Sequence, residues 1–334
     1  MRKQIEGQGK AVVVADMHND LAGHVLKWRR NGMARVMETM YLDDMRAGGV
    51  NLILCAIFLS DGVAPDWTSE ALAQIEALYA DVAESSDHFA LCRSCAEMDR
   101  ALDSGRIALL LGLEGGEPVT DLAMLRRFRE LGVRFLGLTH KRPNALADGC
   151  TFTAVDEPEE PRGRLSAFGA EVVAEAAKLG MAIDLSHLGE EAFMDVLALN
   201  AGPVFASHTN AQAVNGIRRN FSDAQIRAVA KRGGLIGMNG YSRVVHASGK
   251  ADVRQLVDHI DHCTRLVGWE CVGLGIDLFA FFNPDRTDIF PDVIKGYKAL
   301  PQLTAELTRR EYTPEQIAGI LGANFVRFLR SHDF

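Results

Sequence analysis

The chain has 334 residues, of which 48% are hydrophobic, and its formal net charge at pH 7 is −8. This acidic balance is not typical of a protein that follows the phosphate backbone, so we expect no nucleic-acid partner. The sequence has no run of about 20 apolar residues, so we expect no membrane partner. Its six cysteines suit reduced thiols, and we expect a cytoplasmic location. We predict a single domain over residues 1–334.

Eight short apolar segments recur along the chain, and stretches with helical periodicity lie between them. Continuous apolar segments of this length are typical of strands that are buried on both faces of a parallel sheet. They lie at residues 11–15, 51–58, 107–113, 134–138, 181–185, 203–206, 234–238 and 271–276. Helices are predicted at residues 67–86, 122–131, 168–179, 191–199, 222–231 and 252–267. This alternation predicts an α/β fold, a (β/α)₈ TIM-like barrel over about residues 11–280, followed by extra helices at about residues 290–331.

One Pro- and Glu-rich segment, residues 150–164, has no periodicity and is expected to be a long loop after the fourth predicted strand. Loops that follow strands lie on the active-site face of such a barrel. The segment contains the acidic residues Asp156, Glu157, Glu159 and Glu160. Two interpretations stay open: these residues attract basic substrates, or they form a solvated charged loop, which is the simpler of the two.

Histidines and carboxylates follow most of the predicted strands, at the end where a (β/α)₈ barrel carries its active site. In chain order they are His18, Asp20, Glu114, His140, His187, His208 and Asp277. Each one alone has an ordinary structural explanation, such as a helix N-cap for Asp20. Their joint placement on one rim indicates a metal-dependent active site instead. Asp16 is expected to orient neighbouring groups rather than bind metal.

The spacing of these residues predicts two metal sites. His18 and Asp20 are two residues apart, so in an extended strand exit both side chains point the same way and can reach one ion. His187 and His208 follow adjacent strands and can share a second ion, and Glu114 can bridge the two. Imidazole and carboxylate ligands suit Zn²⁺, so we predict two divalent ions, most simply zinc, as cofactors. Such a pair can hold a hydroxide as the nucleophile near neutral pH.

The motifs around these residues resemble the membrane (renal) dipeptidase family of zinc metallopeptidases. The matching segments, in the same order and spacing, include DMHNDL, LEGGEPV, RFLGLTH, IDLSHL, FASHTNA, IRRNFSD and VGLGID. The resemblance implies a TIM-like barrel that holds two zinc ions. His18 and Asp20 match the ligands of one ion, His187 and His208 match those of the other, and Glu114 matches the bridging carboxylate.

The resemblance also implies four roles beyond metal binding. His140 matches a histidine that polarises the substrate, and Asp277 matches a catalytic acid/base. Arg219 matches the arginine that binds the substrate carboxylate, and Tyr241 lies where a pocket tyrosine is expected. The chain departs from the family at Leu146, where a Trp is common, and at residues 278–280, where Leu-Phe-Ala replaces Phe-Asp-Gly. These departures leave the substrate preference open.

The predicted function is hydrolysis of the peptide bond of a small dipeptide, with D-residues at the C-terminal position as one open option. The alternative is another metal-dependent amidohydrolase, such as a deacetylase, lactonase or deaminase, because the same barrel and metals serve those reactions. Arg219 favours the dipeptidase, since it calls for a substrate with a free carboxylate. A homo-oligomer is compatible with the sequence.

Overall fold

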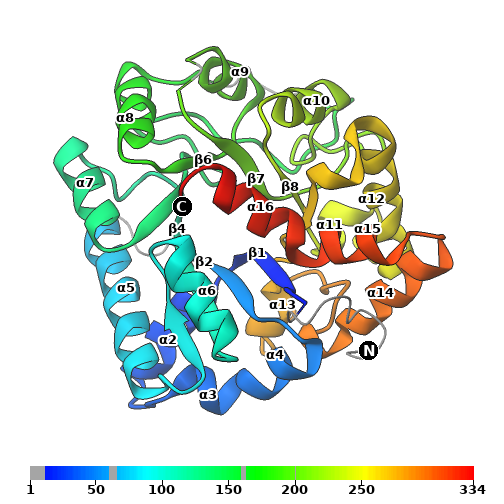
Figure 1. The fold of residues 1–334 in the computed structure, drawn as a ribbon. Helices are drawn as coiled ribbons and strands as arrows, with labels where there is room; N and C mark the ends of the chain where they lie inside the picture. Colours follow the sequence, from blue (N-terminus) through cyan, green and yellow to red (C-terminus); the bar gives the residue numbers. More distant parts are fainter. Residues whose placement is uncertain (1–11, 60–65, 159–162, 200) are drawn as a thin grey trace.

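Eight parallel strands form a nearly closed barrel in the order β1-β2-β4-β5-β6-β7-β8-β9 (Figure 1). The structure is a computed structural model that describes residues 12–59, 66–158, 163–199 and 201–334. The strands are β1 (Ala15–Asn19), β2 (Leu52–Phe58), β4 (Ile107–Glu114), β5 (Val133–Gly137), β6 (Ala182–Asp184), β7 (Val204–Thr209), β8 (Ile236–Met238) and β9 (Val272–Leu274). Each corresponds to one predicted strand, so the predicted (β/α)₈ barrel is confirmed.

Helices surround this barrel (Figure 1). They are α2 (Leu21–Arg30), α3 (Val36–Met40), α4 (Leu42–Gly48), α5 (Trp67–Glu84), α6 (Cys95–Asp103), α7 (Leu122–Glu130), α8 (Ala167–Lys178), α9 (Glu190–Leu199), α10 (Asp223–Lys231), α11 (Ser242–Val245), α12 (Val253–Val267), α13 (Phe279–Phe282), α14 (Leu300–Arg309), α15 (Pro314–Ala318) and α16 (Asn324–Ser331). Helix α10 begins at a capping box, in which the Ser222 hydroxyl accepts a hydrogen bond from the Gln225 backbone N–H. In the described part of the chain, no helix has both the length and the hydrophobicity that a bilayer-spanning helix requires.

Most strand ends differ from the sequence prediction by one or two residues, and the differences that bear on the site are at β1, β7 and an additional strand, β3. Strand β1 begins at residue 15, where the prediction ended, so His18 lies inside the strand rather than after it, and Ala11 lies outside the described residues. Strand β7 likewise runs on to include His208. Polar residues can extend these strands because their side chains meet partners at the barrel mouth. The short strand β3 (Phe89–Leu91) was not predicted; it pairs with residues 107–109 of β4, and its three residues are too few for a periodic signal.

The barrel interior is filled by alternate strand residues, which point inward because side chains alternate across a strand. These inward residues include Ala15, Met17, Leu52, Leu54, Ala108, Leu110, Phe135 and Phe205. The C-terminal helix α16 crosses the barrel at the end away from the polar strand termini (Figure 1). Its Phe328 ring lies 5.6 Å from the Phe205 ring, and its Phe325 ring lies 6.2 Å from the Phe135 ring. With this end closed by aromatic side chains, the opposite end is left for the functional site.

A glycine after β9 lets two strands approach closely beside a site histidine. A Cβ on Gly275 would lie 1.8 Å from the Ser207 carbonyl oxygen and 3.1 Å from the His208 Cα. We therefore expect Gly275→Ala to lower the free energy of unfolding by about 1–3 kcal/mol or more, as overpacking does. Urea titration measures the change. Gly23→Ala is the control, since the nearest atom to its Cβ, Gln74 Oε1, is 3.7 Å away and its helix favours alanine. A Gly275→Ala protein as stable as wild type would contradict the close approach.

Candidate metal centre and active site

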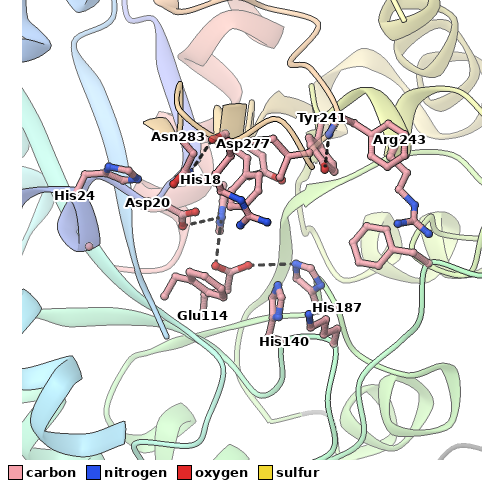
Figure 2. Close-up of a pocket in the computed structure, with 18 of the residues that line it drawn as sticks. His18, Asp20, His24, Glu114, His140, His187, Tyr241, Arg243, Asp277 and Asn283 are labelled. Carbon is pink, nitrogen blue, oxygen red and sulfur yellow. Dashed lines mark hydrogen bonds and ion pairs between the residues drawn. The ribbon is translucent and has the colours of Figure 1, made fainter. Parts of the chain in front are cut away.

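A pocket of about 710 Å³ lies at the carboxyl ends of the strands (Figure 2). Its lining contains seven of the nine residues that the sequence predicts for the site: His18, Asp20, Glu114, His140, His187, Tyr241 and Asp277. The other two lie directly behind His187. The His208 Nε2 atom is 2.9 Å from the His187 Nε2 atom, and the Arg219 Nη2 atom is 3.1 Å from it. The fold thus gathers all nine residues, which come from segments up to 259 residues apart (18 to 277).

Glu114, the last residue of β4, lies at the centre of the cluster (Figure 2). One carboxylate oxygen, Oε2, is 3.5 Å from His18 Nε2. The other oxygen, Oε1, is 3.1 Å from His187 Nε2 and 3.4 Å from His208 Nε2. Each oxygen therefore faces a different group of imidazoles, which is the arrangement a carboxylate needs if it is to serve two cations at once.

His18 and Asp20 are close together on the β1 side of Glu114. The His18 Nε2 atom is 3.7 Å from an Asp20 carboxylate oxygen. The structure adds two neighbours that the spacing argument did not assign to metal. Asp277 has a ligand atom within 4.8 Å of those of His18 and Asp20, and His140 has one within 4.8 Å of those of Glu114 and His187. Both residues are therefore placed to act on whatever the cluster binds.

Burial holds the histidines of the cluster in their neutral form. The pKa of His18 is lowered to about 3, first by burial and then by the positive charge of Arg219. Burial, followed by nearby positive charge, also lowers the pKa values of His187 and His208 well below the usual range. A neutral imidazole keeps a nitrogen lone pair, which is the form that binds a metal ion.

The carboxylates of the cluster have too little positive charge around them. Burial, and then the charge of Asp277, raises the pKa of Asp20 to about 8. Burial also raises the pKa of Glu114 well above its usual range, and it raises the pKa of Asp277. Asp20 Oδ1 is buried and has no hydrogen-bond partner among the described residues. One buried and two partly buried carboxylates beside neutral imidazoles form a donor set that fits divalent cations.

Two site residues have backbone conformations that are uncommon outside glycine. His187, just after β6, has φ of 64°, and Asp277, after β9, has φ of 55°. The left-handed region costs an ordinary residue about 1–2 kcal/mol, so the surrounding structure must hold it in place. The Asp277 side chain is held in addition by the Asn239 amide, whose Nδ2 donates to Asp277 Oδ2 at 3.0 Å. Nothing in the sequence indicated this conformation, because neither position is a glycine.

Asp16 connects the two strands at the seam of the barrel, β1 and β9. Its Oδ1 accepts hydrogen bonds from the backbone N–H groups of Ile276, at 2.8 Å, and His18, at 3.3 Å. Its Oδ2 accepts a hydrogen bond from the Tyr297 hydroxyl at 2.6 Å. Asp16 therefore positions the backbone beside His18 and beside Asp277 at the same time, in keeping with the orienting role expected from the sequence.

The two adjacent arginines of the IRRNFSD motif, Arg218 and Arg219, have different locations and hydrogen-bond partners. Arg219 is 1% exposed, and its Nη2 donates to the His208 carbonyl at 2.7 Å. Its Nε and Nη1 atoms are buried and have no hydrogen-bond partner in the described part of the chain. The Arg218 guanidinium instead donates to the carbonyl oxygens of Val155 and Glu157, in the 150–164 segment. Only Arg219 lies beside the cluster, and it has N–H groups left for an anion.

The pocket wall contains residues that sequence reasoning missed, among them Phe58, His24, Lys27, Phe152, Arg243 and Phe290. They come from strand β2, helices α2 and α11 and two loops, which meet only in the folded chain, so no local motif marks them. Phe152 belongs to the predicted long loop, which has neither helix nor strand where it is described. Its acidic residues Asp156 and Glu157 are exposed and are not part of the pocket lining, while Glu159 and Glu160 lie outside the described residues.

The chain is similar in sequence to dipeptidases. The sequence profile of the membrane dipeptidases, peptidase family M19, matches residues 2–333. A Schizosaccharomyces pombe protein described as an uncharacterized dipeptidase is 34% identical over 229 residues, which are 67% of this chain and 53% of that protein. The chain thus matches about half the length of that curated relative.

Solved structures have the same fold. Dipeptidase AC, a metallopeptidase of family M19, superposes with a TM-score of 0.85 and is 25% identical over 97% of this chain and 99% of that chain. A metallopeptidase from Rhodobacter sphaeroides, liganded with a phosphinate mimic of the dipeptide L-Ala-D-Ala, has a TM-score of 0.84 and 24% identity over 97% of this chain and 100% of that chain. On the profile match over nearly its whole length, the chain belongs to the membrane dipeptidase family, peptidase family M19.

Proposed function

We propose that this protein is a metal-dependent dipeptidase, which hydrolyses the peptide bond of a dipeptide with a free C-terminal carboxylate. The observation that carries the proposal is Glu114, whose two oxygens face His18 on one side and His187 with His208 on the other. Family membership supports the reaction class. The L-Ala-D-Ala mimic bound by the Rhodobacter sphaeroides protein makes dipeptides with a D-residue in second position the first substrates to test.

Two divalent ions fit the donor set, with His18 and Asp20 as ligands of one, His187 and His208 as ligands of the other, and Glu114 shared. Ions bound there would supply Lewis acidity and a lower pKa for water. Zinc is the ion that these ligand types favour. The single-domain organisation, the cytoplasmic location and the homo-oligomer stay predictions.

The remaining side chains would act on the substrate. His140 would donate a hydrogen bond to the scissile carbonyl oxygen as negative charge develops there. Asp277, oriented by Asn239, would accept a proton from the attacking water and return it to the leaving amine. Arg219 would bind the C-terminal carboxylate through Nε and Nη1, which have no hydrogen-bond partner among the described residues. The Tyr241 hydroxyl already accepts a hydrogen bond from the Phe290 backbone N–H at 3.2 Å, so its own proton is available to the substrate.

Metal analysis tests the centre directly. Zinc-loaded protein is expected to hold about two ions per chain and to cleave Ala-D-Ala, and a chelator is expected to abolish that turnover. His208→Ala should lose one ion preferentially, while Glu114→Gln should weaken both, because the two Glu114 oxygens face the two groups. A stoichiometry of zero or one after zinc loading would contradict the two-ion proposal.

A further inference from the structure

The wall of the pocket next to His187 presents a cation held between two aromatic rings. Arg243, in the short helix α11, is exposed and lines the pocket (Figure 2). Its guanidinium carbon is 5.3 Å from the centre of the Phe152 ring and 5.5 Å from that of the Phe290 ring. These rings come from two different loops, the 150–164 segment and the loop after α13. Stacking on two rings limits where the guanidinium can go without using its N–H donors.

The carboxylates that line the pocket are engaged elsewhere. Asp20, Glu114 and Asp277 belong to the cluster described above. The other two form pairs of their own: Glu70 binds Arg30 through both oxygens, at 2.9 and 2.7 Å, and Asp288 binds Arg286. Within the described ranges, the Arg243 guanidinium forms no hydrogen bond and no ion pair. A fixed cation at the pocket wall with no counter-ion among the described residues is suited to an anion that arrives with the ligand.

Arg243 lies on the same side of the cluster as Arg219. The Phe152 ring, on which Arg243 stacks, is 6.4 Å from the His187 ring, and Arg219 Nη2 is 3.1 Å from His187 Nε2. Asp20 and His24 lie on the other side of Glu114 (Figure 2). A dipeptide whose main-chain carboxylate meets Arg219 therefore directs the side chain of its C-terminal residue, rather than of its N-terminal residue, toward Arg243.

We propose that Arg243 is a specificity-determining residue that binds a side-chain carboxylate on the C-terminal residue of the substrate. The enzyme then prefers dipeptides that end in aspartate or glutamate over neutral ones of the same shape. This inference rests on the proposed dipeptidase function and on Arg219 as the partner of the main-chain carboxylate. The planar guanidinium fits a carboxylate with two parallel hydrogen bonds, and the two flanking rings keep it oriented for that contact.

The test compares Ala-Asp with Ala-Asn, a pair of nearly equal shape that differs in charge, with the second residue in both D and L forms. For the configuration that is hydrolysed, wild type is expected to favour the acid by roughly 10-fold or more in kcat/KM, as a charge-assisted contact does. In Arg243→Gln the acid-to-amide ratio should fall to about one, and Arg243→Lys should recover part of it. The ratio in wild type should also shrink at high salt, because the contact is at an exposed wall.

Arg286→Gln is the matched control. Arg286 also lines the pocket, but its guanidinium is paired with Asp288, so the acid-to-amide ratio should stay at the wild-type value. Equal kcat/KM values for Ala-Asp and Ala-Asn in wild type would overturn the proposal. The proposal would also be overturned if Arg243→Gln lowered kcat/KM by the same factor on Ala-Asp, Ala-Asn and Ala-Ala. That pattern would mean that the role of Arg243 does not depend on the side chain of the substrate's C-terminal residue.

Calorimetry separates this proposal from the proposed function. Zinc-loaded protein is titrated with Ala-D-Asp and with Ala-D-Asn, and the two affinities are compared in wild type and in Arg243→Gln. Tighter binding of the acid that depends on Arg243, in a protein that cleaves neither compound, would reject the dipeptidase and keep the carboxylate contact. Cleavage of Ala-D-Ala with no preference for the acid in binding or turnover would keep the dipeptidase and reject the contact.

Discussion

Asp277→Asn is expected to lower kcat by roughly 10²- to 10⁴-fold, the range for a lost general acid/base. The amide keeps the size of the carboxylate but cannot accept the proton from the attacking water. The fold should tolerate the change, because Asn adopts the left-handed backbone conformation of this position, φ 55°, more readily than most residues. Steady-state kinetics on a hydrolysed dipeptide, with thermal unfolding of both proteins, measures the two effects.

The metal content of Asp277→Asn distinguishes two explanations for a lower kcat. Asp277 has a ligand atom within 4.8 Å of those of His18 and Asp20, so it is also near enough to serve as a ligand. If Asp277→Asn keeps its metal while kcat falls, the residue acts on protons. If metal and activity disappear together, Asp277 belongs to the ligand set instead. Wild-type turnover in the variant would reduce Asp277 to a structural residue.

Arg219→Ala is expected to lower kcat/KM by roughly 100-fold or more, the effect of losing a charge-assisted contact of about 3 kcal/mol. The guanidinium is buried behind His187 with Nε and Nη1 unused, and a lysine cannot present that fork to a carboxylate. Arg219→Lys should therefore already weaken turnover. Arg218→Ala is the matched control, because Arg218 is bound to the carbonyl oxygens of Val155 and Glu157 and should matter less to the substrate.

The substrate offers an independent check on Arg219. A dipeptide amide lacks the carboxylate, so wild type should cleave it far more slowly than the free acid. The same amide should lose little further on Arg219→Ala, because the partner of the guanidinium is already absent. Acid and amide cleaved equally well by wild type would contradict the carboxylate contact, and a metal-dependent amidohydrolase of another kind would then be the better assignment.

The barrel could be predicted from the sequence because parallel strands that are buried on both faces must consist of apolar residues. A strand covered on both faces must be apolar along its length, so segments such as residues 51–58 and 107–113 stand out from the amphipathic stretches between them. The three residues of β3 carry no such signal, since pairing with β4 alone makes them a strand. The predicted end of β1 was too early for a related reason: its residues after Met17 are polar, and only the barrel mouth around them stabilises an extended conformation.

The candidate ligands could be predicted because a (β/α)₈ barrel brings all its strand ends to one rim. Any His, Asp or Glu that follows an apolar segment is therefore a neighbour of the others, however far apart they are in the chain. The family profile confirms the resemblance that these motifs carried. Their individual roles stay predictions until the variants above are measured.

By itself, the sequence determined which residue types stand at the strand ends, because that depends only on local apolar patterning and on the order of the segments. The tertiary structure alone decided how those side chains face one another. The opposed oxygens of Glu114, the left-handed backbone at His187 and the position of Arg243 between Phe152 and Phe290 all depend on packing between segments distant in the chain. Such contacts are set by how loops from different strands pack together, and no local pattern of residues encodes that geometry.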